Sequence, residues 1–305
     1  MKRKIFLLAN YLLAGGLLFY LFRKSGGSFS LDFLKGASPV YLVPASLTAL
    51  FFRMLFYPWL WQKSFVSSGC AVAFRELFLV NAASLPLKYL LPFKITEIVR
   101  SAGIRLLGQV DFLCALSTTV LLRIVAILST LFLFFLGGLG RGDIRAVLIS
   151  GLIMLFLILL TVFFGKLPDE VFGIDISKAK IPFVSSGYAE KQVLFLYALV
   201  MQSGEVLTSF FIIKAAGLHF SFPVLLYSVS LMMLFSMLPF SVQGIGVRET
   251  VSVLTFGRLV SSGEALRIGL LLTLIHHVFP AVLGGLIWLF NSTMRIFGKS
   301  SLSEV

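Results

Sequence analysis

Long apolar stretches, separated by short polar segments, dominate the pattern of positions along this chain. Several of them run for about 18 to 24 residues, the length needed to cross a hydrocarbon core of roughly 30 Å. They lack the alternation of a transmembrane β-strand, and backbone groups in lipid must bond internally, so we expect helices. The pattern predicts full crossings at about 5–22, 39–61, 112–137, 145–165, 190–214 and 266–291.

Two further apolar regions, about 71–110 and about 221–262, are not typical of simple spans. Each contains an apolar helix, a Leu-Pro-Phe break, a polar turn and a second short helix. Proline lacks a backbone donor and disfavours the helical conformation of the residue before it, so each break should interrupt its helix. Interrupted segments are tolerated at membrane depth only under protein or water, and we therefore predict re-entrant or broken helix hairpins.

The two interrupted regions also indicate an internal repeat. The tripeptide Leu91-Pro92-Phe93 recurs as Leu238-Pro239-Phe240, at an offset of 147 residues, and this offset brings the other predicted helices into rough correspondence. Each half then has three crossings, an odd number, so the second half should be upside down relative to the first. We predict an all-α membrane bundle of two inverted repeats, residues 1–140 and 141–305, with a polar loop at about 166–190.

Composition agrees with a membrane protein. Hydrophobic residues make up 58% of the chain and charged residues only 13%, about half the share of a soluble protein. The net charge of +13 fits positive-inside loops and contact with anionic lipid. No aromatic and basic module for nucleic acid is visible, so we expect no such partner. We predict the inner (cytoplasmic) cell membrane, with the basic N-terminus Met1-Lys2-Arg3-Lys4 in the cytoplasm.

The polar turns after Pro92 and Pro239 form the first candidate site. A short helix that begins inside the membrane presents free N–H groups and a positive dipole end, which favour phosphate. Arg100 follows the first turn and Arg248 the second. Each arginine could hold a phosphate through two parallel hydrogen bonds, so we predict that both bind a lipid head group.

Glycines and carboxylates accompany these arginines. Gly244 and Gly246 would let a ligand approach the backbone closely. Glu97 and Glu249 could orient the arginines or bind a cationic part of a head group. Alternatively, the Glu97–Arg100 and Arg248–Glu249 pairs are internal ion pairs that only fix the hairpins. Polar groups at membrane depth are costly and usually functional, which favours the binding site.

Three more charges fall within predicted spans: Arg53, Arg123 and Glu205. None can face lipid without a large cost, so each should face the interior of the bundle. They could line a cationic cavity for an anionic lipid head group, or they could pair with one another between helices. Both interpretations require buried partners, and the sequence does not decide between them.

His276 and His277 lie in the last predicted helix, before Pro280. Neighbouring helix positions point about 100° apart, so the two rings should not easily share one ligand site. His276, with Glu205, is a candidate proton relay; the alternative is a hydrogen-bonding partner between helices.

The chain shows no nucleophile–base pair, zinc-type spacing or Walker loop. We therefore predict no catalytic site, no metal and no cofactor, and we do not expect an enzyme.

The residues Leu238 through Glu249 carry a resemblance to a known family. A proline, two glycines and then Gly-Val-Arg-Glu resemble the signature of the lysylphosphatidylglycerol synthetase transmembrane region, also described as flippase-like integral membrane proteins. The first hairpin, from Pro92 to Arg100, is similar to the family's other polar motif, but Lys94-Ile95-Thr96 stands where glycine is expected. The resemblance covers about 5–291.

This resemblance implies a membrane-embedded lipid translocase-like module, sometimes fused to a soluble aminoacyl-lipid synthase or glycosyltransferase. The leading hypothesis is a flippase that binds the phosphate head group of a phospholipid or polyprenyl-phosphate-type lipid and moves it by alternating access. One alternative is a membrane-embedded lipid glycosyl or acyl transferase, with Glu97 or Glu249 as its base. Another is a non-transporting partner of a separate lipid-modifying synthase. We expect no aminoacyl transfer from these 305 residues by themselves.

Overall fold

The computed structural model describes residues 36–90, 95–108, 110–166, 170–171, 174–175, 188–237 and 246–300, and over these ranges the chain is almost entirely helical. The predicted crossing at 5–22 lies outside the described residues. So do both Leu-Pro-Phe breaks and Gly244.

Thirteen helical segments and two short strands make up the described chain. In order they are α2 (Pro39–Leu50), the π-helix η2 (Phe51–Phe56), α3 (Tyr57–Ser67), α4 (Phe74–Leu90), α5 (Thr96–Gly108), α6 (Phe112–Arg141), α7 (Ile144–Gly165), β1 (Glu170–Val171), β2 (Ile174–Asp175), α9 (Tyr188–Ala215), α10 (Phe222–Met237), α11 (Val247–Phe256), α12 (Ser262–Thr273), the π-helix η3 (Leu274–Val278) and α13 (Phe279–Ser300). β1 and β2 pair antiparallel within the predicted polar loop.

Five continuous helical stretches among the described residues are long and apolar enough to cross a membrane. They are Pro39–Ser67, Phe112–Arg141, Ile144–Phe163, Ala189–Ala215 and Ser262–Asn291. These stretches match the five predicted crossings that the structure describes, with ends shifted by a few residues. The all-helical, multi-pass architecture is therefore confirmed.

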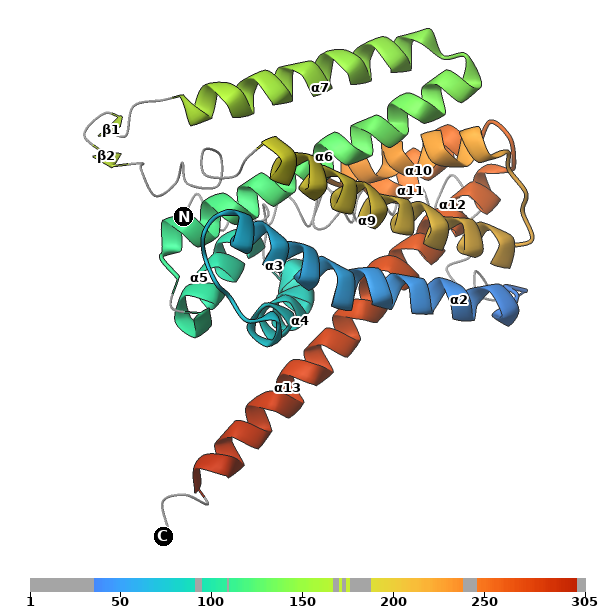
Figure 1. Cartoon of the computed structure of the whole chain (residues 1–305). Coiled ribbons are helices and arrows are strands. Elements are labelled where there is room, and N and C mark those ends of the chain that lie inside the picture. Colours follow the sequence, from blue (N-terminus) through green and yellow to red (C-terminus); the bar gives the residue numbers. More distant parts are fainter. Residues whose placement is uncertain are drawn as a thin grey trace, which may run out of the picture.

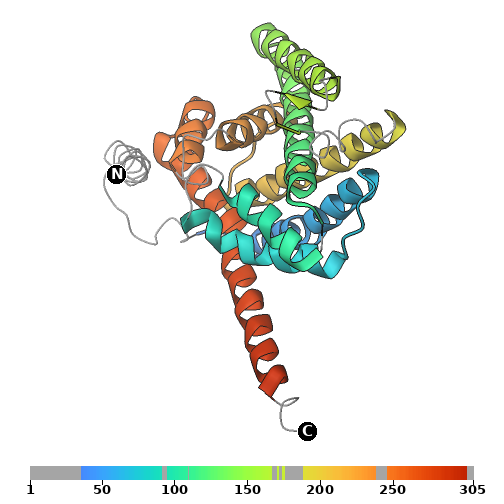
Figure 2. The same ribbon diagram turned by 90° about the vertical axis from the view of Figure 1, so that its left-hand side faces the viewer.

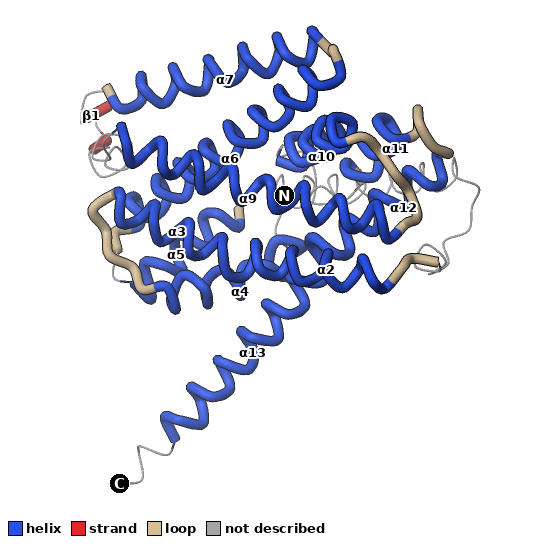
Figure 3. The backbone as a smooth tube through the Cα atoms, turned by 45° about the vertical axis from the view of Figure 1, so that its right-hand side comes forward, coloured by secondary structure: helices blue, strands red, loops and turns tan. Residues whose placement is uncertain are grey.

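The two interrupted regions each form a pair of short helices. The first helix pair is α4 and α5, and the second is α10 and α11. The two pairs lie toward opposite ends of the bundle (Figures 1 and 3). Each pair flanks one of the predicted breaks, and the breaks themselves lie outside the described residues.

Packing joins the first half of the chain to the second. α6 packs against α10, α2 against α9, and α4 against α13. Figure 2 shows α7 at the outer edge of the bundle, opposite the outward course of α13. α7 exposes many large apolar side chains, such as Leu152 and Phe156, which is the surface expected of a helix that faces lipid.

Two of the spans contain a π-helical segment that ends two residues before a proline. η2 precedes Pro58 and η3 precedes Pro280. Proline cannot donate to the carbonyl four residues earlier, and a local widening of the helix accommodates that missing hydrogen bond. The segments place Arg53 and the two adjacent histidines on the inside of the bundle.

A glycine sets the close approach of α6 to α10. A Cβ atom at Gly137 would lie only 2.6 Å from the backbone nitrogen of Tyr227 on α10. The neighbour is backbone and cannot rotate away, so a side chain would push the helices apart. Small residues at such contacts are the usual means of tight packing between membrane helices.

We expect Gly137→Ala to destabilise the protein by about 1 to 3 kcal/mol, the usual cost of overpacking. Thermal unfolding in detergent measures this. Gly151→Ala on α7 is the matched control, because a Cβ there meets no atom within 4 Å. Equal melting temperatures for the two variants would contradict the α6–α10 contact.

Candidate functional site

A cavity of about 150 Å³ lies between the two apolar cores of the bundle. Val229 and Leu272 of one core and Leu122 and Ala198 of the other line it. Both helix pairs and several spans contribute to its wall. The residues predicted from the sequence that line this cavity are Arg53, Glu97, Arg100, Arg123, Glu205, Arg248 and His276.

The cavity wall combines positively charged side chains with apolar ones. Among the described residues that line it, five carry a formal positive charge and two a negative charge, an excess of three positive charges. Four methionines, Met201, Met232, Met233 and Met237, lie in the same wall. Methionine adapts its shape to irregular apolar partners. The cavity thus offers positive charge and flexible apolar surface together.

Arg100 is held by a network of neighbours. Its Nε donates to Ser84 Oγ at 2.7 Å, and its Nη2 donates to Asn81 Oδ1 at 2.9 Å. Its Nη1 lies 3.1 Å from Tyr57 Oη and 3.2 Å from Glu97 Oε2. The residue is only 2% exposed. Most of its donors are therefore used within the protein, as the ion-pair alternative predicted.

Arg123 and Lys88 have fewer hydrogen-bonding partners than Arg100 among the described residues. Arg123 Nη1 lies 4.0 Å from Glu97 Oε1, and its side chain is 34% exposed. No hydrogen bond or close ion pair joins Lys88 to another residue that the structure describes. Both side chains line the cavity. With respect to the described residues, both cations therefore keep bonding capacity for a ligand.

Arg53 and Glu205 form an ion pair between two spans. Arg53 Nη2 lies 2.6 Å from Glu205 Oε1, and His276 Nδ1 lies 2.6 Å from Glu205 Oε2. Asn81 Nδ2 donates to the Arg53 carbonyl at 2.8 Å. From the sequence, an ion pair of Arg with Glu and the lining of a cavity were two alternative interpretations of these residues. In the structure the same residues do both.

His276 and His277 both reach this ion pair. His276 contacts Glu205, and His277 Nε2 lies 3.3 Å from Arg53 Nη2. The expectation that adjacent rings would not share one site assumed α-helical spacing. Each ring contacts a different side chain, so this expectation stays a prediction.

Glu249 and Gly246 lie apart from the cavity wall. Glu249 is 1% exposed; its Oε2 accepts from the Gly246 amide at 2.8 Å, and its Oε1 accepts from Thr273 at 2.6 Å. Gly246 is the N-cap of α11 and has a φ of +81°, a conformation that favours glycine. The carboxylate of Glu249 thus occupies the amide that a phosphate was expected to bind.

Sequence reasoning missed several residues of the cavity, among them the polar residues Tyr57, Asn81 and Lys88. Asn81 and Lys88 are polar residues within an apolar helix, and that pattern could have singled them out. Tyr57 gave no such signal, because tyrosine is common in membrane helices.

The sequence profile of the family described as Lysylphosphatidylglycerol synthase TM region matches residues 7–284. No curated protein matches the chain. The match covers most of the chain and confirms the resemblance seen in the second hairpin.

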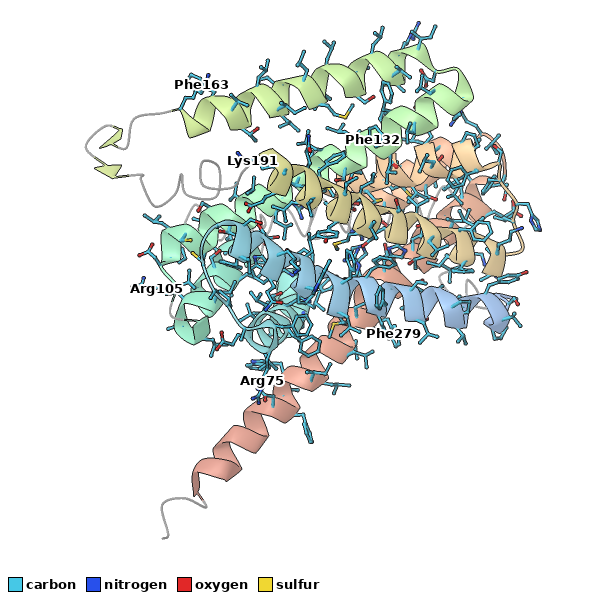
Figure 4. All side chains as sticks on the ribbon, in the orientation of Figure 1. Arg75, Arg105, Phe132, Phe163, Lys191 and Phe279 are labelled. Carbon is cyan, nitrogen blue, oxygen red and sulfur yellow. The ribbon has the colours of Figure 1, made fainter. Side chains whose placement is uncertain are left out.

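We expect Arg100→Met to destabilise the protein by about 3 to 5 kcal/mol, because Glu97 and Asn81 would lose their buried partner. Thermal unfolding in detergent measures the loss. Arg105→Met is the control, since Arg105 lies on the same helix but at the outer edge of the bundle (Figure 4). A similar, small effect of both variants would show that the Arg100 network does not support the fold.

Proposed function

The chain belongs to the lysylphosphatidylglycerol synthase TM region family, and from this premise we propose that it is a flippase-like lipid transporter. Its substrate is a lipid with an anionic phosphate head group, a phospholipid or a polyprenyl-phosphate-type lipid. The head group binds in the central cavity and crosses the membrane by alternating access while the tails stay in the bilayer.

The observation that carries the proposal is the excess of positive charge in the cavity wall. Positive charge inside a membrane protein is costly, and an anionic ligand offsets it. Arg123 and Lys88 contact the phosphate in this proposal, because they have the most free donors. Arg53, Arg248 and Arg100 add to the positive potential. The methionines of the wall accommodate the apolar part next to the head group.

The inverted repeat belongs to the same proposal, and the packing pattern supports it. A two-fold axis that exchanges the halves would exchange α6 with α12–α13 and the first helix pair with the second. The contact of α6 with α10 would then have its counterpart in the contact of α13 with α4, and both contacts are present. Likewise α5 packs on α6, and α11 packs on α12. Residues 1–140 and 141–305 are the two repeats in this proposal.

Opposite placement of the helix pairs supports alternating access. The first pair lies toward one end of the bundle and the second toward the other (Figures 1 and 3). Two re-entrant hairpins that enter from opposite faces would each close one side of the cavity in turn. The proposal also places the protein in the inner (cytoplasmic) membrane, with its N-terminus in the cytoplasm.

The transferase alternative gains no support from the geometry. It needs a free carboxylate base beside the phosphate. Glu249 already accepts two hydrogen bonds away from the cavity, and Glu97 is paired with Arg100. We therefore keep transport by a protein that is not itself an enzyme as the proposed function, with partnership to a separate lipid-modifying synthase as the remaining alternative.

We expect Arg123→Gln and Lys88→Gln each to slow transport of a fluorescent phosphatidylglycerol about 10- to 100-fold. Each change removes a charge-assisted hydrogen bond, worth about 1.5 to 3 kcal/mol. The assay uses proteoliposomes in which dithionite bleaches the outer leaflet.

The control is Arg258→Gln, because Arg258 is exposed on the turn after α11 and outside the cavity wall. It should transport at the wild-type rate. A fluorescent phosphatidylcholine, which has no net charge, should move much more slowly than phosphatidylglycerol. Wild-type rates in both cavity variants would remove their assigned role, and equal rates for the two lipids would remove the selectivity for anions.

A further inference from the structure

The pair formed by Glu205 and His276 has an unused nitrogen. His276 Nδ1 lies 2.6 Å from Glu205 Oε2, so this nitrogen carries the hydrogen and donates it to the carboxylate. The other ring nitrogen, Nε2, is buried and has no hydrogen-bond partner among the described residues. The residue is 5% exposed and lines the central cavity. A buried acceptor without a partner costs free energy and calls for an explanation.

Binding of a proton explains why Nε2 of His276 is buried without a hydrogen-bond partner among the described residues. In a neutral imidazole whose Nδ1 holds the hydrogen, Nε2 is a bare lone pair, which is the position where a proton adds. The imidazolium that forms keeps its bond to Glu205 and gains an Nε2–H donor. That donor then needs an acceptor of its own, and an oxygen of an anionic head group in the cavity supplies one.

The charges around the pair make the two binding events depend on each other. Arg53 from η2, Lys88 from α4, Arg248 from α11 and His277 from η3 are the charged and titratable groups that act on the histidines, besides Glu205. Arg53, Glu205 and a neutral His276 sum to zero formal charge. A proton adds one positive charge to a wall that already has an excess of three. An anionic head group offsets this added charge.

We propose that the Glu205–His276 pair is a proton-binding site and that the cavity binds one proton together with each anionic head group, which makes the transport proton-coupled. This inference rests on the proposed function. Linkage is reciprocal, so the head group favours protonation as much as the proton favours the head group. While the pair titrates, a tenfold rise in proton concentration strengthens head-group binding by up to about tenfold.

The experiment measures proton uptake during lipid binding. Dioctanoylphosphatidylglycerol is titrated into the full chain in detergent by calorimetry, at one pH in two buffers of different ionisation enthalpy. Repeats at several values between about pH 5 and 8 cover the range in which histidine titrates. The wild type should take up about one proton per bound lipid, and its affinity should fall as the pH rises. This result needs no variant, so a folding defect cannot obscure it.

Variants then locate the proton. His276→Gln and Glu205→Gln should bind the lipid with little proton uptake and with an affinity that no longer depends on pH. His219→Gln is the control, because His219 is exposed and contacts Lys214 outside the cavity. It should behave as the wild type. Wild-type proton uptake in the His276→Gln variant would overturn the assignment.

The outcomes separate this inference from the proposed function. Binding of the anionic lipid by the wild type without proton uptake would overturn the proton site and leave the lipid site standing. An absence of binding, with transport also absent in proteoliposomes, would overturn the proposed function itself and the proton site with it.

Discussion

Charge compensation inside the membrane is the constraint on which this structure depends. A charged side chain among transmembrane helices must find a partner, because neither lipid nor bulk water can offset its charge there. Among its described residues, the chain nevertheless places five cations and two carboxylates around one cavity. The helices must therefore break, widen and approach one another where these side chains meet. The π-helices before Pro58 and Pro280 and the interruption of each helix pair serve that requirement.

The charges in the cavity divide into two groups with different roles. Arg100 on α5 has four hydrogen-bonding neighbours and scarcely any exposed surface, so it holds α5 to α4 and α3. Arg123 and Lys88 make fewer contacts with the described residues, and in the proposed function they bind the anion. The Arg53–Glu205 pair has both roles, because it joins two spans and also borders the cavity. One wall thus combines support of the fold with capacity for a ligand.

Much of this arrangement could be predicted from the sequence, for a physical reason. Apolar length predicts spans and proline predicts breaks, since both effects are local. A charge such as Arg53 or Glu205 must turn inward, and the sequence therefore identified most of the polar wall. Contacts between distant segments could not be predicted in this way. The hydrogen bond that Thr273 donates to Glu249 joins α12 to α11, and the contacts of His276 with Glu205 and of His277 with Arg53 join the last span to two others.

The close contacts between the halves have a mechanical consequence. Gly137 joins α6 to α10, and a Cβ at Gly284 on α13 would lie 2.6 Å from the carbonyl oxygen of Ala82 on α4. In both places a long helix from one half of the chain packs against a short helix from the other half, backbone against backbone. If each contact holds its two helices together as one rigid body, each body contains helices from both halves of the chain. A boundary between moving parts would then cut across the two proposed repeats, and neither repeat would have a complete packing surface if it folded without the other.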